Sequence, residues 1–268
     1  MAKVLVNIFY IIGIYLFIVF LLYIFQRSLL YLPSNEKIDV TYYSMTELKP
    51  VYLKTSDGLI LKSLFQKPKT SYNQTILVFH GNAGHIGHRV KKFKPFLDAG
   101  YGLLLLEYRG YSDNPGKPSE KGLQEDSIAA INFLSKHYIP LNKIILYGES
   151  LGCGLATKLS TKEQFHSTIL EAPYTSISDV AQHHYWLLPA KWMVLDQFDI
   201  IGIINKIKSP LLVVHGEKDN IISVAFGKRV FDTAPYPKKA IFIPNAGHNN
   251  LYEFNLYEKI FNFIKNIT

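Results

Sequence analysis

Six short apolar runs alternate with stretches of helical periodicity, and this alternation limits the chain to a small set of folds. An apolar run of about five to eight residues predicts a strand that is buried on both faces. Such strands separated by helices predict the α/β class, a mostly parallel sheet flanked by helices. The runs are TILVFH (75–80), YGLLLLEY (101–108), KIILYG (143–148), STILEAP (167–173), PLLVVHG (210–216) and KAIFIPN (239–245). With 268 residues, 48% of them apolar, the chain can form one large domain of this class plus an appendage.

Three other stretches refine this prediction. Alternating runs at 51–56 and 59–67 are joined by Asp57-Gly58, a pair that favours a tight turn, and together they predict a β-hairpin. Ser119 suits the N-cap of a helix over EKGLQEDSIAAINFLSKHY. Residues 176–199 break the alternation between two strands, are rich in aromatic side chains and contain both tryptophans. We therefore predict that they form a small cap insertion over one end of the sheet.

The N-terminal segment Val4 to Phe25 contains no charged residue. A helix of about 22 residues is roughly 33 Å long, which is enough to cross a bilayer core. A cleaved signal peptide has a shorter apolar core of about 7–15 residues and a small-x-small site, and the flank QRSLLYLPS offers no such site. We expect residues 1–27 to form an uncleaved single-pass transmembrane anchor, residues 28–50 a juxtamembrane linker, and residues 51–268 the α/β domain. The flanking charges Lys3 and Arg27 are balanced, so they favour neither side of the membrane.

The run KIILYG leads into Gly148-Glu149-Ser150-Leu151-Gly152, and a helical stretch follows. This is the G-x-S-x-G pattern in its required strand–turn–helix context. The serine lies on a tight, strained turn that exposes its Oγ, and the glycines are needed because side chains would clash across the turn. Ser150 is therefore the predicted nucleophile.

A serine hydroxyl needs a base, and the base needs an acid that orients it. The order after such a nucleophile is Asp or Glu and then His. Asp219 follows the run PLLVVHG and His248 follows the run KAIFIPN, so both lie beyond strand ends, where open α/β sheets place their ligands. Glu217 is the weaker choice of acid because it lies closer to the strand. His215 lies within or at the end of a strand and is interpreted as a packed structural histidine.

The motifs resemble those of the membrane-anchored serine hydrolases of the α/β-hydrolase superfamily, which have one N-terminal membrane segment and a serine aminopeptidase-like domain. Relatives of this kind include acyl-protein depalmitoylases. The resemblance covers nearly the whole chain and rests on QRSLLYLPS, HGNAGH, YRGYSDNPGKPSEKGL, YGESLGCGLA, APYTSISDVA, HGEKDNII and NAGHNN. Ser112 and Asn114 depart from it, because the family has glycine and serine there, and this leaves the path of the loop open. Arg109 is expected to steady this loop through an ion pair.

The resemblance implies hydrolysis of acyl esters or thioesters through an acyl-enzyme. The aromatic cap and the membrane anchor lead us to expect lipids or lipidated proteins as substrates. The Ser150, His248 and Asp219 triad leads to the same reaction class. The oxyanion needs two N–H donors, and we expect the backbone N–H of Leu151 and that of Asn82, with Ala83 as the alternative. Asn82 is therefore expected to act mainly through its main chain. An aminopeptidase or amidase on the same triad and a catalytically silent membrane-tethered scaffold are the alternatives.

The segment FHGNAGHIGHR also raises other kinds of site. A metal site would require His80, His85 and His88 to converge, and a phosphate loop would require a Lys and a Ser or Thr that GNAGH lacks. We expect no metal or cofactor. His80 is expected to pack the loop, and His85 and His88 to start the next helix. The net charge of +8 is scattered without a basic stripe, so nucleic-acid binding is not expected, and the single cysteine excludes an internal disulfide. The oligomeric state is not indicated.

Overall fold

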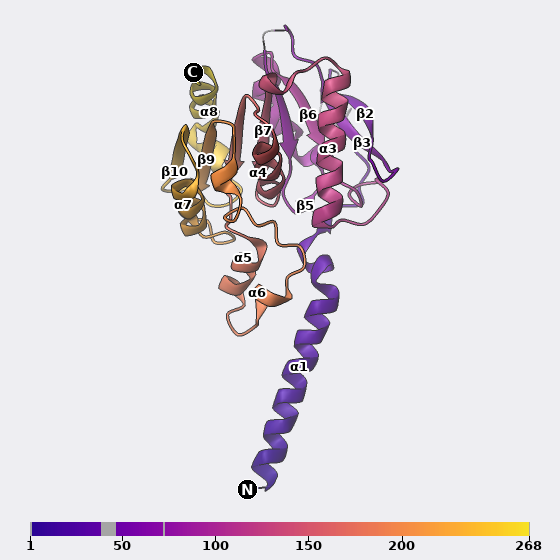
Figure 1. Cartoon of the computed structure of the whole chain (residues 1–268), viewed down its shortest axis with the longest axis vertical. Helices are drawn as coiled ribbons and strands as arrows, with labels where there is room; N and C mark the ends of the chain where they lie inside the picture. Colours follow the sequence, from indigo (N-terminus) through magenta and orange to yellow (C-terminus); the bar gives the residue numbers. More distant parts are fainter. Residues whose placement is uncertain (1, 39–46, 72, 268) are drawn as a thin grey trace.

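The computed structural model describes residues 2–38, 47–71 and 73–267, and its centre is a twisted eight-stranded sheet (Figure 1). Six strands are parallel, and the antiparallel hairpin lies at one edge. In spatial order the strands are β10 (Lys238–Ile243), β9 (Leu211–Gly216), β8 (Ser167–Glu171), β7 (Ile144–Glu149), β4 (Thr75–Phe79), β6 (Gly102–Leu106), β3 (Ile60–Gln66) and β2 (Lys49–Lys54). The six apolar runs and the Asp-Gly hairpin are thus found as predicted.

Helices cover both faces of the sheet and divide its apolar side chains into two cores. One core is built with α3 (Glu120–Lys136), α4 (Gly152–Lys162) and α7 (Val224–Thr233), and the other with α2 (Val90–Asp98) and α8 (Leu256–Lys265). The Ser119 side chain accepts a hydrogen bond from the N–H of Gly122, as expected of the N-cap of α3. Strands β4, β6, β8 and β9 are buried along their whole length, and β7 is buried except at its last residue, Glu149. Their side chains therefore supply both cores.

The helix α1 (Ala2–Leu30) leaves the body of the molecule and extends away from it (Figure 1). It is long and apolar enough to cross a membrane, and none of its most apolar window is buried. The cap contains α5 (Ile177–His184) and the short α6 (Ala190–Met193), which lie beyond the end of the sheet beside the base of α1 (Figure 1).

The segment after α1 is tied to the α/β domain. Strand β1 (Leu32–Pro33) pairs in parallel with β5 (Ala83–Gly84), which lies in the loop after β4. The Ser34 N–H also donates to the Gly84 carbonyl at 3.1 Å. Part of the segment expected to be a linker therefore forms a two-stranded sheet with the HGNAGH loop.

Candidate active site

Ser150 lies at the sharp turn between β7 and α4. Its φ of 51° falls in the left-handed region, which is strained for a residue with a side chain. A Cβ on Gly148 would lie 2.6 Å from the Cα of Cys153, and one on Gly152 would lie 2.1 Å from the carbonyl oxygen of Phe79. Both contacts are with backbone atoms that cannot easily shift, so this turn requires both glycines of the motif.

Three side chains from separate loops meet at this turn. The Oγ of Ser150 is 3.2 Å from Nε2 of His248, and Nδ1 of His248 is 2.7 Å from Oδ2 of Asp219. Asp219 follows β9 and His248 follows β10, so the residues come from the carboxyl ends of three parallel strands. The structure therefore brings the three predicted catalytic residues into one hydrogen-bonded chain.

The carboxylate of Asp219 is buried and is held by more than the imidazole. Its Oδ1 accepts the backbone N–H groups of Ile221 at 2.9 Å and Ile222 at 2.8 Å, and its Oδ2 lies 3.2 Å from Nε2 of His215. Burial alone would raise the pKa of Asp219, but the hydrogen bonds from His215 and His248 outweigh it and hold the pKa well below its usual range. The carboxylate is therefore ionised and fixed in position.

His215 contacts the triad acid Asp219, although its position in strand β9 does not predict this contact. The side chain is fully buried, as expected of a packed histidine, and its Nε2 lies 2.8 Å from the carbonyl oxygen of Ile222. The same nitrogen approaches Asp219, four residues further along the chain. This i, i+4 spacing was the only sequence signal for the contact, and it carries little information outside a helix.

Two backbone N–H groups lie where the oxyanion donors are expected. Leu151 follows Ser150 directly, and Asn82 lies in the loop after β4. A Cβ on Gly81 would be 3.5 Å from the Cβ of Ser150, so this loop lies against the nucleophile. Among the described residues neither N–H donates a hydrogen bond, so both are available to a substrate oxygen.

The loop that carries Asn82 is fixed by its neighbours. The carbonyl oxygen of Asn82 accepts the N–H of Leu32 at 2.9 Å and the hydroxyl of Tyr111 at 2.7 Å. The Asn82 side chain donates to the carbonyl oxygen of Leu30 at 2.9 Å. Leu30 is the last residue of α1, so the side chain has a structural role, which reasoning about its main chain alone does not include.

Comparisons with known proteins show the family of the chain. A family model described as serine aminopeptidase, S33, matches residues 70–200. The alpha/beta hydrolase domain-containing protein 17B of Xenopus laevis is 30% identical over 236 residues, which cover 86% of this chain and 80% of the relative. This chain belongs to the α/β-hydrolase family. The resemblance inferred from the motifs is confirmed.

A further relative and a solved structure are similar to this hydrolase over different shares of its chain. A lysophosphatidylserine lipase of Danio rerio is 33% identical over 205 residues, which cover 67% of this chain and 53% of the lipase. An esterase structure from Pyrococcus furiosus is 18% identical and has a TM-score of 0.68, covering 89% of this chain and 97% of that one. At this identity the esterase shows the shared fold, which confirms the predicted fold class.

The loop with the two departures from the family pattern keeps a glycine-like backbone. Ser112 has a φ of 52°, a conformation that glycine adopts without strain. Its N–H donates to the carbonyl oxygen of Ser34 at 2.9 Å, and its Oγ donates to Glu107 at 3.0 Å. The side chain of Asn114 accepts from the N–H of Lys62 at 2.7 Å and donates to its carbonyl oxygen at 3.1 Å. These contacts stabilise the path of the loop, including the left-handed conformation that serine disfavours at position 112.

Arg109 binds two carboxylates, as the ion-pair interpretation predicted. Its guanidinium lies 2.6 Å from Asp57 in the hairpin turn and 2.7 Å from Asp126 in α3. The hydrogen bond from Arg109 is the largest reason why the pKa of Asp57 is lowered to about 2. Arg109 thus joins the hairpin to α3 and lies in none of the contacts of the triad.

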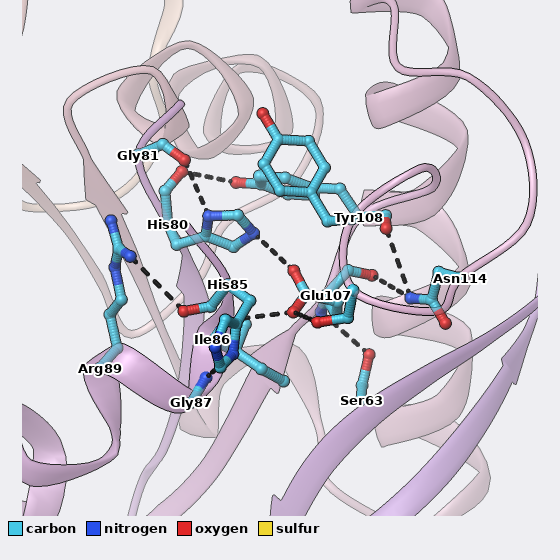
Figure 2. A network of polar contacts seen from close by, with 12 residues as sticks. Ser63, His80, Gly81, His85, Ile86, Gly87, Arg89, Glu107, Tyr108 and Asn114 are labelled. Atoms are coloured by element: carbon cyan, nitrogen blue, oxygen red, sulfur yellow. Dashed lines mark hydrogen bonds and ion pairs between the residues drawn. The ribbon is translucent and has the colours of Figure 1, made fainter. Parts of the chain in front are cut away.

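Figure 2 shows the buried network that holds the start of the HGNAGH loop. The Nδ1 of His80 lies 2.7 Å from the carbonyl oxygen of Gly81, and Nε2 lies 3.0 Å from Oε1 of Glu107. The Tyr108 hydroxyl donates to the His80 carbonyl at 2.9 Å, and the two rings stack with centroids 4.0 Å apart. Glu107 also accepts the N–H of Ile86 at 3.1 Å. His80 therefore packs the loop, as predicted.

His85 and His88 lie at the start of the next helical segment and close to Glu36, a residue that the sequence did not single out. In the described chain these three side chains offer ligand atoms within 4.8 Å of one another. However, Nδ1 of His85 accepts the N–H of Gly87 at 3.1 Å, so a neutral ring carries its proton on Nε2, the atom that faces Glu36. A metal at that Nε2 would require this helix cap to break, and the geometry does not fit a preformed ligand set.

A buried ion-pair network lies beside the nucleophile. Lys92 is 2.6 Å from Glu149 and 2.6 Å from Glu171, and Arg89 is 2.9 Å from Glu149. Burial alone would raise the pKa of Glu149, but Lys92 and Arg89 outweigh it and hold the pKa well below its usual range. A cleft of about 270 Å³ is lined by these four residues and by His248. The cleft is therefore polar, and its charges are paired with one another.

Proposed function

We propose that this protein is a membrane-anchored serine hydrolase that cleaves acyl esters or thioesters through an acyl-enzyme. The observation that carries the proposal is the hydrogen-bonded chain from Ser150 to His248 to Asp219, with distances of 3.2 Å and 2.7 Å. The two available N–H groups of Leu151 and Asn82 beside the nucleophile add a second, independent requirement of the same reaction.

Each residue then has a defined role. The Oγ of Ser150 attacks the carbonyl carbon while Nε2 of His248 takes its proton, and the buried Asp219 holds the imidazole with Nδ1 protonated. The N–H groups of Leu151 and Asn82 donate to the oxygen that becomes negative. His248 returns its proton to the departing alcohol or thiol, and a water activated by the same histidine releases the acyl group from Ser150.

The substrate class rests on two observations. The helix α1 is apolar, unburied and long enough to span a bilayer, which keeps the site near lipid. A relative named as a lysophosphatidylserine lipase favours an ester with an acyl chain. A chain-length series of p-nitrophenyl esters tests this choice, and an optimum at the shortest acyl chain would contradict a lipid-like substrate.

Labelling with a fluorophosphonate probe tests the nucleophile. The wild-type chain in detergent should be labelled, Ser150→Ala should not, and Ser135→Ala should be labelled normally because Ser135 is an exposed serine on α3. Thermal unfolding of each variant ensures that only folded proteins are compared. Labelling of folded Ser150→Ala at the wild-type level would overturn the assignment.

An aminopeptidase on the same triad is the second candidate, favoured by the family model that matches residues 70–200. Such an enzyme needs an unpaired carboxylate for the substrate's α-ammonium group. In the cleft beside His248, Glu149 and Glu171 are both paired with Lys92. We therefore place the ester reaction first. Parallel assays with acyl and aminoacyl p-nitroanilides and esters separate the two, and absence of activity on all of them would favour a silent scaffold.

A further inference from the structure

The cap exposes large apolar side chains at its outer end. We use the term cap tip for residues 185–195, which include Trp186 at 73% exposure, Leu187 at 66% and Trp192 at 89%. Aromatic side chains rarely remain this exposed together on a protein that contacts only water. We therefore expect another molecule, such as lipid or a second protein surface, to cover the cap tip.

The cap tip contacts the apolar helix directly. The hydroxyl of Tyr15 donates to the carbonyl oxygen of Leu187 at 2.9 Å. Gln26 donates to the carbonyl oxygen of Met193 at 3.2 Å and accepts the N–H of Leu195 at 2.7 Å. These bonds join residues 167 to 172 positions apart in the sequence and place the cap tip along the side of α1.

The position of Tyr15 sets how far the cap tip extends. Arg27 lies twelve positions after Tyr15, which corresponds to about 18 Å of helix. A tyrosine side chain spans only part of that length. Leu187 therefore lies beside the apolar part of α1, beyond the charged residue that marks its end.

The hydrogen bond of Tyr15 fits an apolar surrounding. A hydroxyl inside a bilayer has no water to bond, and leaving it unpaired is costly. The Leu187 carbonyl supplies an acceptor for it. Tryptophan side chains favour the membrane interface, where the ring is apolar and the N–H meets polar groups.

A buried carboxylate fixes the cap to the anchor. Asp196 accepts from the Nε of Arg27 at 2.8 Å, from the hydroxyl of Tyr31 at 3.1 Å and from the N–H of Glu120 at 3.1 Å. It thus connects the end of α1, the end of the cap and the start of α3. When α1 spans a bilayer, the cap tip is held within the leaflet that surrounds the C-terminal half of α1.

We propose that the cap tip is a second membrane contact, which inserts into the leaflet that surrounds the C-terminal half of α1. The occupant is lipid because the exposed cap tip is continuous with the exposed apolar surface of α1, and one medium must cover both. This proposal rests on the anchor in the proposed function but not on the reaction. It has a structural consequence, because His184 at the end of α5 lies 2.8 Å from the carbonyl oxygen of Ile221 in the loop of Asp219. The membrane contact and the triad acid are therefore connected through the cap.

The two tryptophans of the chain, Trp186 and Trp192, both lie in the cap tip, so intrinsic fluorescence reports on it without a label. The full chain is placed in nanodiscs of phosphatidylcholine brominated near the headgroup end of the acyl chain. The variants Trp186→Phe and Trp192→Phe resolve the two positions. We expect quenching by brominated lipid and protection from aqueous iodide. Quenching by iodide without quenching by brominated lipid would overturn the proposal and point to a water-exposed surface for a protein partner or a second copy.

Activity provides a second readout with a matched control. The double variant Trp186→Ser and Trp192→Ser should lower the rate on a long-chain ester in vesicles by about tenfold or more, because it removes two apolar membrane contacts. Its rate on a soluble short-chain ester should stay within twofold of the wild-type rate. Tyr52→Ser, at an exposed aromatic residue on the edge strand β2, should change neither rate. Equal losses on both esters would refute a membrane role. Absence of activity in the wild-type chain would refute the proposed function and leave the quenching result unaffected.

Discussion

Replacing Lys92 with methionine should destabilise the hydrolase domain far more than replacing its neighbour Lys94 in the same helix. The Lys92 ammonium group lies 2.6 Å from Glu149 and 2.6 Å from Glu171, and all three side chains are at least four-fifths buried. Methionine retains most of the aliphatic length but removes the charge that both carboxylates share. Glu171 would keep the Tyr147 hydroxyl as a donor but would have no cation within ion-pair distance among the described residues.

Removal of one partner from a buried ion pair costs about 3–5 kcal/mol, because a buried charge is left without compensation. For a domain of this size, 1 kcal/mol shifts the unfolding midpoint by about 2–4 °C, so we expect a drop of roughly 6–20 °C. Lys94 pairs with Asp98 at 2.6 Å, but both side chains are more than half exposed. Such an exposed i, i+4 pair contributes about 0.3–0.5 kcal/mol, so Lys94→Met should lower the midpoint by about 1–2 °C.

The assay is thermal unfolding of the full chain in detergent, followed by tryptophan fluorescence, for the wild type and both variants. A pH series also tests the direction in which the stability contribution of this network changes with pH. The pKa of Glu149 is lowered in the folded state, so its contribution is present above its unfolded pKa and is lost as pH falls towards the folded one. The gap between wild type and Lys92→Met should therefore narrow below about pH 4. If Lys92→Met unfolds within about 2 °C of Lys94→Met at neutral pH, the network does not contribute as described.

Three further predictions concern the site. Asp219→Asn should lower kcat by about 10⁴-fold with a folded structure, because asparagine favours the wrong imidazole tautomer, and esterase kinetics with a loss below tenfold would contradict this role. Asn82→Ala breaks the hydrogen bond to the Leu30 carbonyl but keeps the main-chain N–H, so we expect a smaller loss of kcat than in Ser150→Ala. Equal losses of kcat in folded proteins would mean that the Asn82 side chain acts in the reaction. Gly152→Ala places a Cβ 2.1 Å from the Phe79 carbonyl oxygen, so it should prevent folding. The control Ala156→Gly in the same helix should leave a folded protein, and limited proteolysis measures both outcomes. A folded and active Gly152→Ala protein would show that the turn can adjust.

Part of the fold and of the site could be predicted because the sequence patterns that indicate them are short and local. A buried parallel strand is a continuous apolar run, so the order of the strands along the chain could be read directly. The glycines around Ser150 are fixed by contacts across a single turn, and such contacts recur wherever this turn forms. Asp219 and His248 follow strand ends, and the carboxyl ends of parallel strands lie at one edge of a sheet.

Other contacts join segments with no pattern in common. The pairing of Leu32–Pro33 with Ala83–Gly84 involves two residues on each side, too few to show alternation, and the expected linker gave no sign of it. Lys92, Glu149 and Glu171 come from α2, β7 and β8, and each of them alone reads as an ordinary charged residue.

The order of the residues was enough to predict the α/β class, the apolar N-terminal helix, the strained turn at Ser150 and the residues expected to serve it. Each of these depends on residues near one another in the chain or on strand ends. By contrast, three contacts are known only from the folded chain: His215 supports Asp219, the end of α1 holds the Asn82 loop, and the cap lies along the anchor. These contacts depend on how rigid elements pack against one another. The contact between the cap and α1 joins residues more than a hundred positions apart in the sequence. Packing of that kind is set by the shape of the whole domain, and no local pattern encodes it.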